Sequence, residues 1–100
     1  MRIITKSRLT DFYIEHASAK KNLLTWYKIT RAAVWQNLVE LRASFPAADL
    51  VGNLTVFNIS GNKYRLIVYI DYAYQTVFIR HVLTHAEYDK NDWKNDDWYG

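Results

Sequence analysis

The period of the hydrophobic pattern changes once along this chain, near residue 54, and no other feature of the sequence constrains the fold as strongly. Before that point, apolar residues recur at three- and four-residue intervals, which is typical of amphipathic helices. Beyond it, apolar and polar residues alternate, which is typical of strands that bury one face. The strands are predicted at residues 54–59, 64–70 and 75–83. Gly61 and Asn62 tolerate the positive φ of a tight hairpin turn, so this half predicts an antiparallel β-meander.

The first half of the chain predicts one short strand followed by two or three helices. The strand is expected at residues 2–5, and a helix at residues 6–17 has Ser7 as its candidate N-cap. Ser18 is a candidate cap for a second helix, and Thr30 marks a place where the helical pattern restarts. Helices followed by a meander predict an α+β fold with the helices packed on one face of the sheet.

The remaining turn and helix-breaking residues set off a loop and a C-terminal tail. Pro46 ends the helical half, and turn residues follow it as far as the first strand of the meander. The whole of residues 1–100 is expected to form a single domain. Residues 91–100 are acidic and aromatic, and they either pack through Trp93 or Trp98 or remain loose.

The charges are distributed unevenly along the chain. Residues 1–80 hold 11 Lys and Arg against 5 Asp and Glu, whereas residues 81–100 hold 2 against 5. A basic body suits an anionic partner such as nucleic acid, although ordinary solubility explains a net charge of +3 equally well. The chain has no cysteine, which excludes disulfides and thiolate metal sites. No apolar run approaches the about 20 residues of a membrane span, and no signal-peptide core is present, so a cytoplasmic protein without a membrane partner is expected.

Two cations mark the start of the second strand of the meander. Because side chains alternate across a strand, Lys63 and Arg65 are expected on one face, about 7 Å apart. A phosphate between them would relieve their repulsion, and the alternative is a pair of solvated surface cations. The opposite face carries the expected core side chains Tyr64, Leu66, Val68 and Ile70. The face with the cations is expected to form an open, concave surface.

The segment "THAEYDK", residues 84–90, gathers groups that transfer protons. Histidine is the usual proton carrier of proteins, which makes His85 a candidate, and Tyr88 is the second candidate for accepting or donating a proton. Thr84 and Glu87 also have the spacing of a helix capping box, and both roles are compatible. His81 and His85 are separated by about 13 Å if both lie on a strand, which is too far for one metal ion. No metal and no other cofactor is therefore expected.

The stretches "GNKYRLI" and "THAEYDK", together with the helical segment that precedes them, resemble the HigB family of toxins. These are type II toxin–antitoxin components of the RelE-like superfamily, and the resemblance covers about residues 1–92. It implies a RelE-like fold and an mRNA interferase that cleaves mRNA on translating ribosomes. It also implies a partner, a HigA-type helix-turn-helix antitoxin that binds the operator DNA. Because a basic surface attracts an acidic segment, we expect a 1:1 pairing over the catalytic surface, either as a single pair or doubled into a heterotetramer.

The same resemblance assigns roles to four residues. Arg65 matches the arginine of the superfamily's "YRL" motif, which contacts the scissile phosphate, and Lys63 lies just before it. His85 and Tyr88 occupy the segment in which the superfamily keeps its proton-transfer residues. The implied reaction is a metal-free transesterification, in which the 2′-hydroxyl attacks the adjacent phosphorus. Which side chain is the base and which is the acid stays open.

Three further residues are candidates for RNA binding: Arg80, His81 and Lys90. Arg80 and His81 are neighbours on one predicted strand, so they are expected to point to opposite faces, and Arg80 is favoured to line the site. Three other functions remain open. These are a gyrase-poisoning toxin of the same fold, which needs no proton-transfer pair, a non-catalytic RNA-binding module, and a housekeeping interaction domain.

Overall fold

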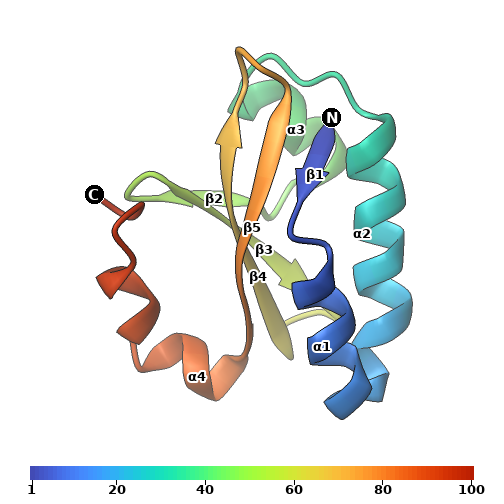
Figure 1. The fold of residues 1–100 in the computed structure, drawn as a ribbon, viewed down its shortest axis with the longest axis vertical. Helices are drawn as coiled ribbons and strands as arrows, with labels where there is room; N and C mark the ends of the chain where they lie inside the picture. Colours follow the sequence, from blue (N-terminus) through green and yellow to red (C-terminus); the bar gives the residue numbers. More distant parts are fainter.

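The computed structural model describes all of residues 1–100 as a mixed five-stranded sheet between a helical layer and a C-terminal arm (Figure 1). The strands are β1 (Arg2–Ile4), β2 (Asp49–Val51), β3 (Leu54–Ile59), β4 (Tyr64–Asp71) and β5 (Thr76–Thr84). The helices are α1 (Ser7–Glu15), α2 (Lys20–Ala32), α3 (Leu38–Ser44) and α4 (His85–Asp89), with short 3-10 helices η1 (Ala17–Ala19) and η2 (Asp92–Asn95). The predicted α+β fold is confirmed. No helix is both long and apolar enough to cross a membrane.

The strands lie in the order β1-β5-β4-β3-β2, and three of them form the predicted antiparallel meander. Strand β1 joins the sheet beside β5 in parallel, with Arg2 opposite Thr76 and Ile4 opposite Phe78. Because β1 ends there, the C-terminal half of β5 has no strand on that side. This half of β5 is therefore an open edge between α1 and the C-terminal arm (Figure 1).

The main core lies between the sheet and the helices, where side chains of alternate strand positions meet the apolar faces of α1, α2 and α3. Trp26 and Phe57 are almost fully buried and their rings meet edge to face, with centroids 5.5 Å apart. The even-numbered positions of β4, from Tyr64 to Ile70, all face this core, as the alternation predicted. Burial of each large apolar side chain here contributes about 1.5–3 kcal/mol to folding.

The opposite face of the sheet carries a smaller core, of which the sequence indicated only the packing of the tail through Trp93, as one of two alternatives. Leu54, Val56, Ile67 and Trp93 are buried together there. Trp93 comes from η2, so the acidic and aromatic tail packs back over the sheet. The expectation of an open concave surface on this face is therefore wrong over the middle of β4, because the C-terminal arm covers it.

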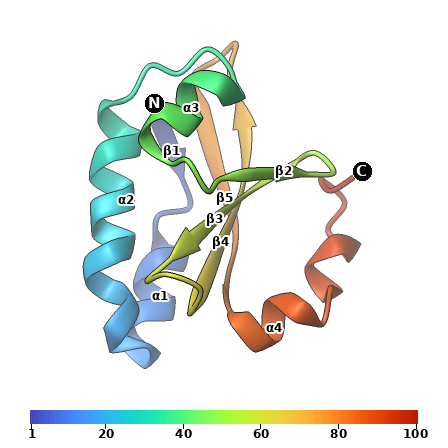
Figure 2. The same cartoon turned by 180° about the vertical axis from the view of Figure 1, so that it is seen from behind.

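The tail also meets the turn between β2 and β3 at the far end of the sheet, as the view from behind shows (Figure 2). The backbone N–H of Asn53 donates to the Tyr99 carbonyl oxygen at 2.7 Å. Gly52 has a φ of 60°, and a Cβ atom there would lie 2.5 Å from the same carbonyl oxygen. Glycine is thus required twice at this position, once for the turn and once for the close approach of the tail.

The helical half differs from the prediction in its boundaries. Thr30 does not restart a helix, because α2 runs through it to Ala32 and buries its side chain completely. The break comes after Ala32, and Asn37 caps α3 by accepting a hydrogen bond from the Glu40 backbone N–H at 2.9 Å. Asparagine is a strong N-cap residue, so the cap rather than Thr30 sets the start of the third helix.

Three further local expectations are wrong. Ser7 is the first helical residue of α1 and its side chain caps nothing. Ser18 lies inside η1 instead of capping α2, and its hydroxyl hydrogen-bonds the Tyr64 hydroxyl of the sheet. Residues 49–51, expected in a loop, form the short edge strand β2 because their backbone completes the ladder with β3.

The covering of the second core by Trp93 leads to a stability prediction. Trp93→Ala should lower the free energy of unfolding by about 3 kcal/mol or more, because the exposed fraction of this side chain is only 3% and truncation leaves a cavity. Urea unfolding followed by circular dichroism measures this. Tyr74→Ala is the control, since Tyr74 is 82% exposed. Equal stability of the two variants would show that the tail does not add to the folded core.

Candidate active site

The hairpin between β4 and β5 brings the two predicted site segments together. Tyr64 at the start of β4 lies opposite Thr84 at the end of β5, so the residues that follow β5 lie beside the β3–β4 turn. The backbone N–H of His85 donates to the Lys63 carbonyl oxygen at 3.0 Å, which ties the start of α4 to that turn. Two segments that are about 20 residues apart in the sequence therefore share one corner of the molecule.

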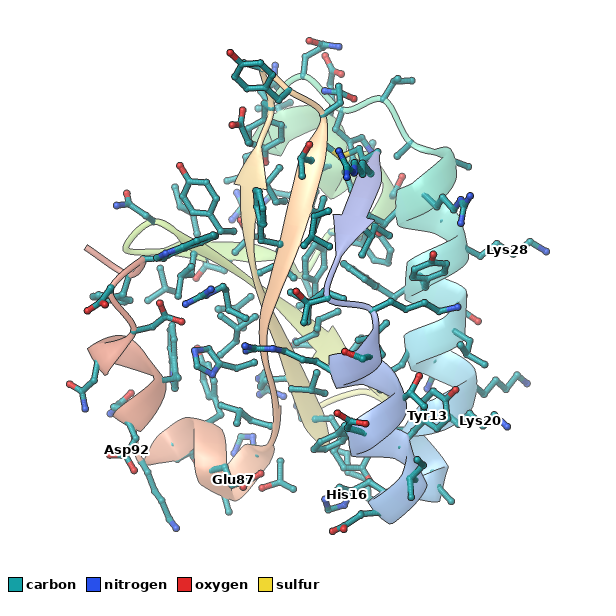
Figure 3. All side chains as sticks on the ribbon, viewed as in Figure 1. Tyr13, His16, Lys20, Lys28, Glu87 and Asp92 are labelled. Carbon is teal, nitrogen blue, oxygen red and sulfur yellow. The ribbon has the colours of Figure 1, made fainter.

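The predicted capping box is confirmed and sets the direction of α4. The Thr84 hydroxyl accepts from the Glu87 backbone N–H at 3.2 Å, and the Glu87 carboxylate accepts from the Thr84 backbone N–H at 2.9 Å. The helix therefore begins directly at the end of β5, with no connecting loop. Glu87 itself lies at the foot of the arm, beside the end of β5 (Figure 3).

Arg65 and His85 are in contact, with 3.2 Å between Arg65 Nη2 and His85 Nδ1. A guanidinium group only donates, so His85 Nδ1 is the acceptor and the ring proton is assigned to Nε2. His85 Nε2 lies 3.1 Å from Asp89 Oδ2, one helical turn further on. The His85 side chain is 51% exposed. The imidazole therefore has one edge on a cation, one edge on a carboxylate, and a face open to a ligand.

Tyr88 completes this cluster from the other side of Arg65. The Arg65 guanidinium carbon lies 5.3 Å from the centre of the Tyr88 ring, within the range of a cation–π interaction. The ring stacks on Trp93 with centroids 5.2 Å apart and planes at 14°. The indole N–H of Trp93 also donates to the Tyr88 carbonyl oxygen at 3.2 Å. The tail thus fixes the position of Tyr88 against the arginine.

Arg65 is almost buried, with 8% of its surface exposed. Its Nη1 donates to the carbonyl oxygens of Asn62 at 3.0 Å and Tyr64 at 3.2 Å, which compensates the cost of burying the charge. Arg65 therefore does not present both of its terminal nitrogens to the site, because Nη1 is occupied by these carbonyl oxygens. The edge of the guanidinium that faces His85 is the part directed toward the site.

Lys63 does not share a face with Arg65, so that expectation is wrong. It lies in the turn before the first ladder pair of β4, where the strand alternation has not yet begun. Its ammonium group donates to the Ser18 hydroxyl at 3.1 Å, on the helical side of the sheet. Lys63 contributes to the cluster through its backbone carbonyl oxygen, which accepts the hydrogen bond from the His85 backbone N–H.

Arg80 and His81 point to the same place, which corrects the expectation that they face opposite ways. His81 pairs with Ile67 and Ile79 pairs with Val68, so Arg80 is an extra residue in the strand, a β-bulge. The bulge cancels the alternation at this point, and both side chains reach Asp96. Arg80 donates to both Asp96 carboxylate oxygens at 2.9 Å, and His81 Nε2 lies 2.8 Å from Oδ2.

Asp96 is the functional neighbour that sequence reasoning missed. Its side chain is 3% exposed. Burial alone would raise its pKa, but hydrogen bonds from Arg80, from the Trp98 backbone N–H and from His81 together hold the pKa at about 2. The Trp98 ring also lies 4.0 Å from the Arg80 guanidinium carbon. The tail is rich in acidic and aromatic residues, and this composition was the only indication that it would pair with Arg80 and His81 of β5.

The other candidates lie around the edges of this corner. Lys90 ends α4 and is exposed, and together with His81 and Trp93 it lines a cavity of about 300 Å³. No group of three or more His, Asp or Glu side chains converges in a metal-binding arrangement. His81 and His85 instead pair with separate carboxylates, those of Asp96 and Asp89.

Comparison with known sequences identifies the family of this chain. Residues 19–91 match the sequence profile of HigB_toxin, the RelE-like toxic component of a toxin–antitoxin system. The chain is 28% identical over 93 residues to the mRNA interferase HigB of Escherichia coli O6:H1, covering 90% of each chain. It is 30% identical over 92 residues to the mRNA interferase toxin HigB of Escherichia coli K12, covering 89% of this chain and 88% of that one. The mRNA interferase HigB of Shigella flexneri matches over 92 residues at the same identity.

These matches, together with the fold, define the class of the protein. The fold, with a helical layer on a meander that ends in a short helix, is that of a RelE-like toxin of a toxin–antitoxin system. Within that class, the chain belongs to the HigB toxin family, as its residues 61–67 and 84–90 predicted.

The lowered pKa of Asp96 predicts how the arm responds to acid. Because the pKa in the folded state is about 2 and an unfolded Asp titrates near about 3.9, the carboxylate stabilises the fold fully above that value. This contribution, about 2 kcal/mol, is lost as the pH falls from about 4 toward 2. Asp96→Asn should therefore be less stable than the parent chain at pH 7, and the gap should narrow toward pH 2. Urea unfolding at both pH values measures it, and a gap that stays constant would contradict the pairing.

Proposed function

We propose that this HigB-family toxin is an endoribonuclease that cleaves mRNA on translating ribosomes in the cytoplasm. The observation that carries this proposal is the contact between Arg65 and His85, with Tyr88 packed against the same guanidinium. A fixed positive charge and two proton-transfer groups within one corner are what cleavage of a phosphodiester requires. Relatives that cover about nine-tenths of the chain carry the name mRNA interferase, which supports the same reaction.

The proposed reaction is a transesterification that uses the RNA's own 2′-hydroxyl as nucleophile. A base takes the 2′ proton, the 2′-oxygen bonds to the adjacent phosphorus, and the bond from phosphorus to the 5′-oxygen breaks. An acid gives a proton to the departing 5′-oxygen, so the products are a 2′,3′-cyclic phosphate and a 5′-hydroxyl. His85 is the leading proton carrier because it is half exposed, and Tyr88 is the second.

Arg65 stabilises the charge that develops on the phosphoryl oxygens. Its Nη1 is held by two backbone carbonyl groups, whereas Nη2 is hydrogen-bonded to the half-exposed ring of His85. When RNA enters, His85 turns toward the reacting oxygens and Nη2 donates to a phosphoryl oxygen in its place. Such a fixed donor contributes about 100- to 1,000-fold to a rate. Lys63 points to the helical layer, so we assign it no direct part in the chemistry.

The RNA-binding role is assigned to the cations on either side of this corner. Lys90 is exposed at the end of α4, next to the cavity that His81 also lines. Arg80 and His81 share the Asp96 carboxylate between them and are each about a quarter exposed, so their remaining N–H groups are available to RNA phosphates.

The toxin–antitoxin family supplies the remaining part of the proposal, a cognate antitoxin. We infer a HigA-type helix-turn-helix protein that binds operator DNA with one domain and the toxin with an acidic, amphipathic segment. Charge complementarity with the basic body of the chain favours such a segment. A 1:1 pairing over the corner of Arg65 and His85 would neutralise cleavage.

Cleavage itself is tested on ribosomes loaded with a defined mRNA, in the presence and absence of EDTA, after free divalent ions are replaced by polyamine to keep the ribosomes assembled. We expect cuts ending in a 2′,3′-cyclic phosphate, equally with and without the chelator. If the mRNA stays intact and the protein instead stalls DNA gyrase when the two are incubated together, the protein is a gyrase poison of the same fold. RNA binding without cuts would identify a non-catalytic module.

The assignment of His85 is tested by substitution. His85→Gln should lower the single-turnover cleavage rate by about 100- to 10,000-fold, because the ring that carries the proton is lost. Arg65→Lys keeps the charge but loses the planar fork, and should cost about 100-fold. Arg31→Lys is the control, since Arg31 is exposed on α2 in the helical layer, away from the arm. Wild-type rates in both site variants would contradict the proposed site.

A further inference from the structure

A second cavity, of about 350 Å³, lies beside the proposed site between α1 and the open edge of β5. Its walls include Arg8, Asp11 and Phe12 from α1, and His81 and Leu83 from β5. Leu83 pairs with Arg65 across the β4–β5 ladder, so the cavity begins one strand away from the backbone of Arg65. None of its α1 residues has a role in the cleavage chemistry proposed above.

The cavity exists because β1 is short. Strand β1 ends where Ile4 pairs with Phe78, so α1 rather than a strand borders the C-terminal half of β5. Arg8 reaches across the gap and donates to the Arg80 carbonyl oxygen. On the other side of β5, the cavity lined by Lys90 shares His81 and Leu83 with this one. The two depressions therefore meet across one strand, and a polynucleotide crossing that strand would occupy both.

The chemistry of the α1 wall fits one nucleotide. Arg8 is exposed and has further guanidinium donors beyond the one it uses on Arg80, which suits a backbone phosphate. The Phe12 ring is held by stacking on His16, with centroids 4.3 Å apart, and supplies an apolar wall. Asp11 is exposed and is the one carboxylate among the lining residues, with no ion pair of its own. A carboxylate repels phosphate but accepts from the amino group of a base.

We propose that this cavity is a nucleotide subsite next to the scissile linkage, in which Arg8 binds a backbone phosphate and Asp11 accepts a hydrogen bond from a base amino group. This inference rests on the proposed ribonuclease function and adds a determinant of sequence preference to it. A base with an amino group is favoured over uracil, whose carbonyl oxygens face the carboxylate unfavourably. Asp11 is thus a specificity residue, and it takes no part in proton transfer.

The role of Arg8 is tested by binding to single-stranded oligonucleotides with 2′-O-methyl groups throughout, which lack the nucleophile. Arg8→Gln should weaken binding about tenfold and reduce the slope of log affinity against log salt by about 0.7. Arg8→Lys should keep that slope. Arg31→Gln, an exposed arginine of α2, is the matched control and should bind like the parent chain. Equal losses in Arg8→Gln and Arg31→Gln would overturn the subsite, because they would show only a general charge effect.

The role of Asp11 is tested by cleavage of ribosome-bound mRNAs that differ in the bases beside each cut. The parent chain should favour a base with an amino group at one flanking position over uracil by about tenfold, and Asp11→Asn should reduce that ratio to near one. Asp97→Asn removes one carboxylate outside this cavity. It is therefore the control for the loss of one negative charge and should keep the ratio. An unchanged ratio in Asp11→Asn would overturn the assignment. If the parent chain cleaves no mRNA at all, the ribonuclease proposal fails, while the oligonucleotide measurement still decides whether Arg8 binds phosphate.

Discussion

The pairing of β4 with β5 is the constraint on which the rest of this structure depends. It places the first residues of one strand against the last residues of the other, so Arg65 and His85 meet although 20 positions separate them. The bond from the His85 backbone to Lys63 and the capping box of α4 then determine where the imidazole lies. A shift of the ladder by one residue would turn the Arg65 side chain into the helical core. Its charge would then be buried without the backbone carbonyl groups that accept its hydrogen bonds here.

The C-terminal arm is the second organising element, and it acts through two aromatic residues and one carboxylate. Trp93 closes the smaller core and holds the ring of Tyr88, whereas Asp96 bonds both Arg80 and His81, which the β-bulge directs to one point. A buried carboxylate is expensive unless its hydrogen bonds are complete, and here donors from Arg80, His81 and the Trp98 backbone complete them. The packing of Trp93 and the hydrogen bonds of Asp96 therefore hold the arm in one position on the sheet.

Much of this molecule follows from its sequence, and the exceptions have physical reasons. The meander and the capping box were predictable because they depend on local periodicity and on residues three positions apart. The bulge at Arg80 was not, since one extra residue in a strand leaves the apolar alternation on both sides intact. The strand start at Tyr64 was predicted correctly, but the alternation was extended one residue back to Lys63, which lies in the turn and so need not share the face of Arg65. The partnership of Asp96 depends on contacts 15 and 16 residues away that no local pattern encodes.

The placement of the four tryptophans has a practical consequence. Trp26 and Trp35 are buried in the helical core, whereas Trp93 stacks beside the site and Trp98 covers the Arg80 guanidinium. The arm thus carries its own optical reporters, because indole emission responds to a neighbouring charge and to stacking. With the two core indoles replaced by phenylalanine, the remaining fluorescence would follow the arm alone as a ligand arrives, without any attached dye.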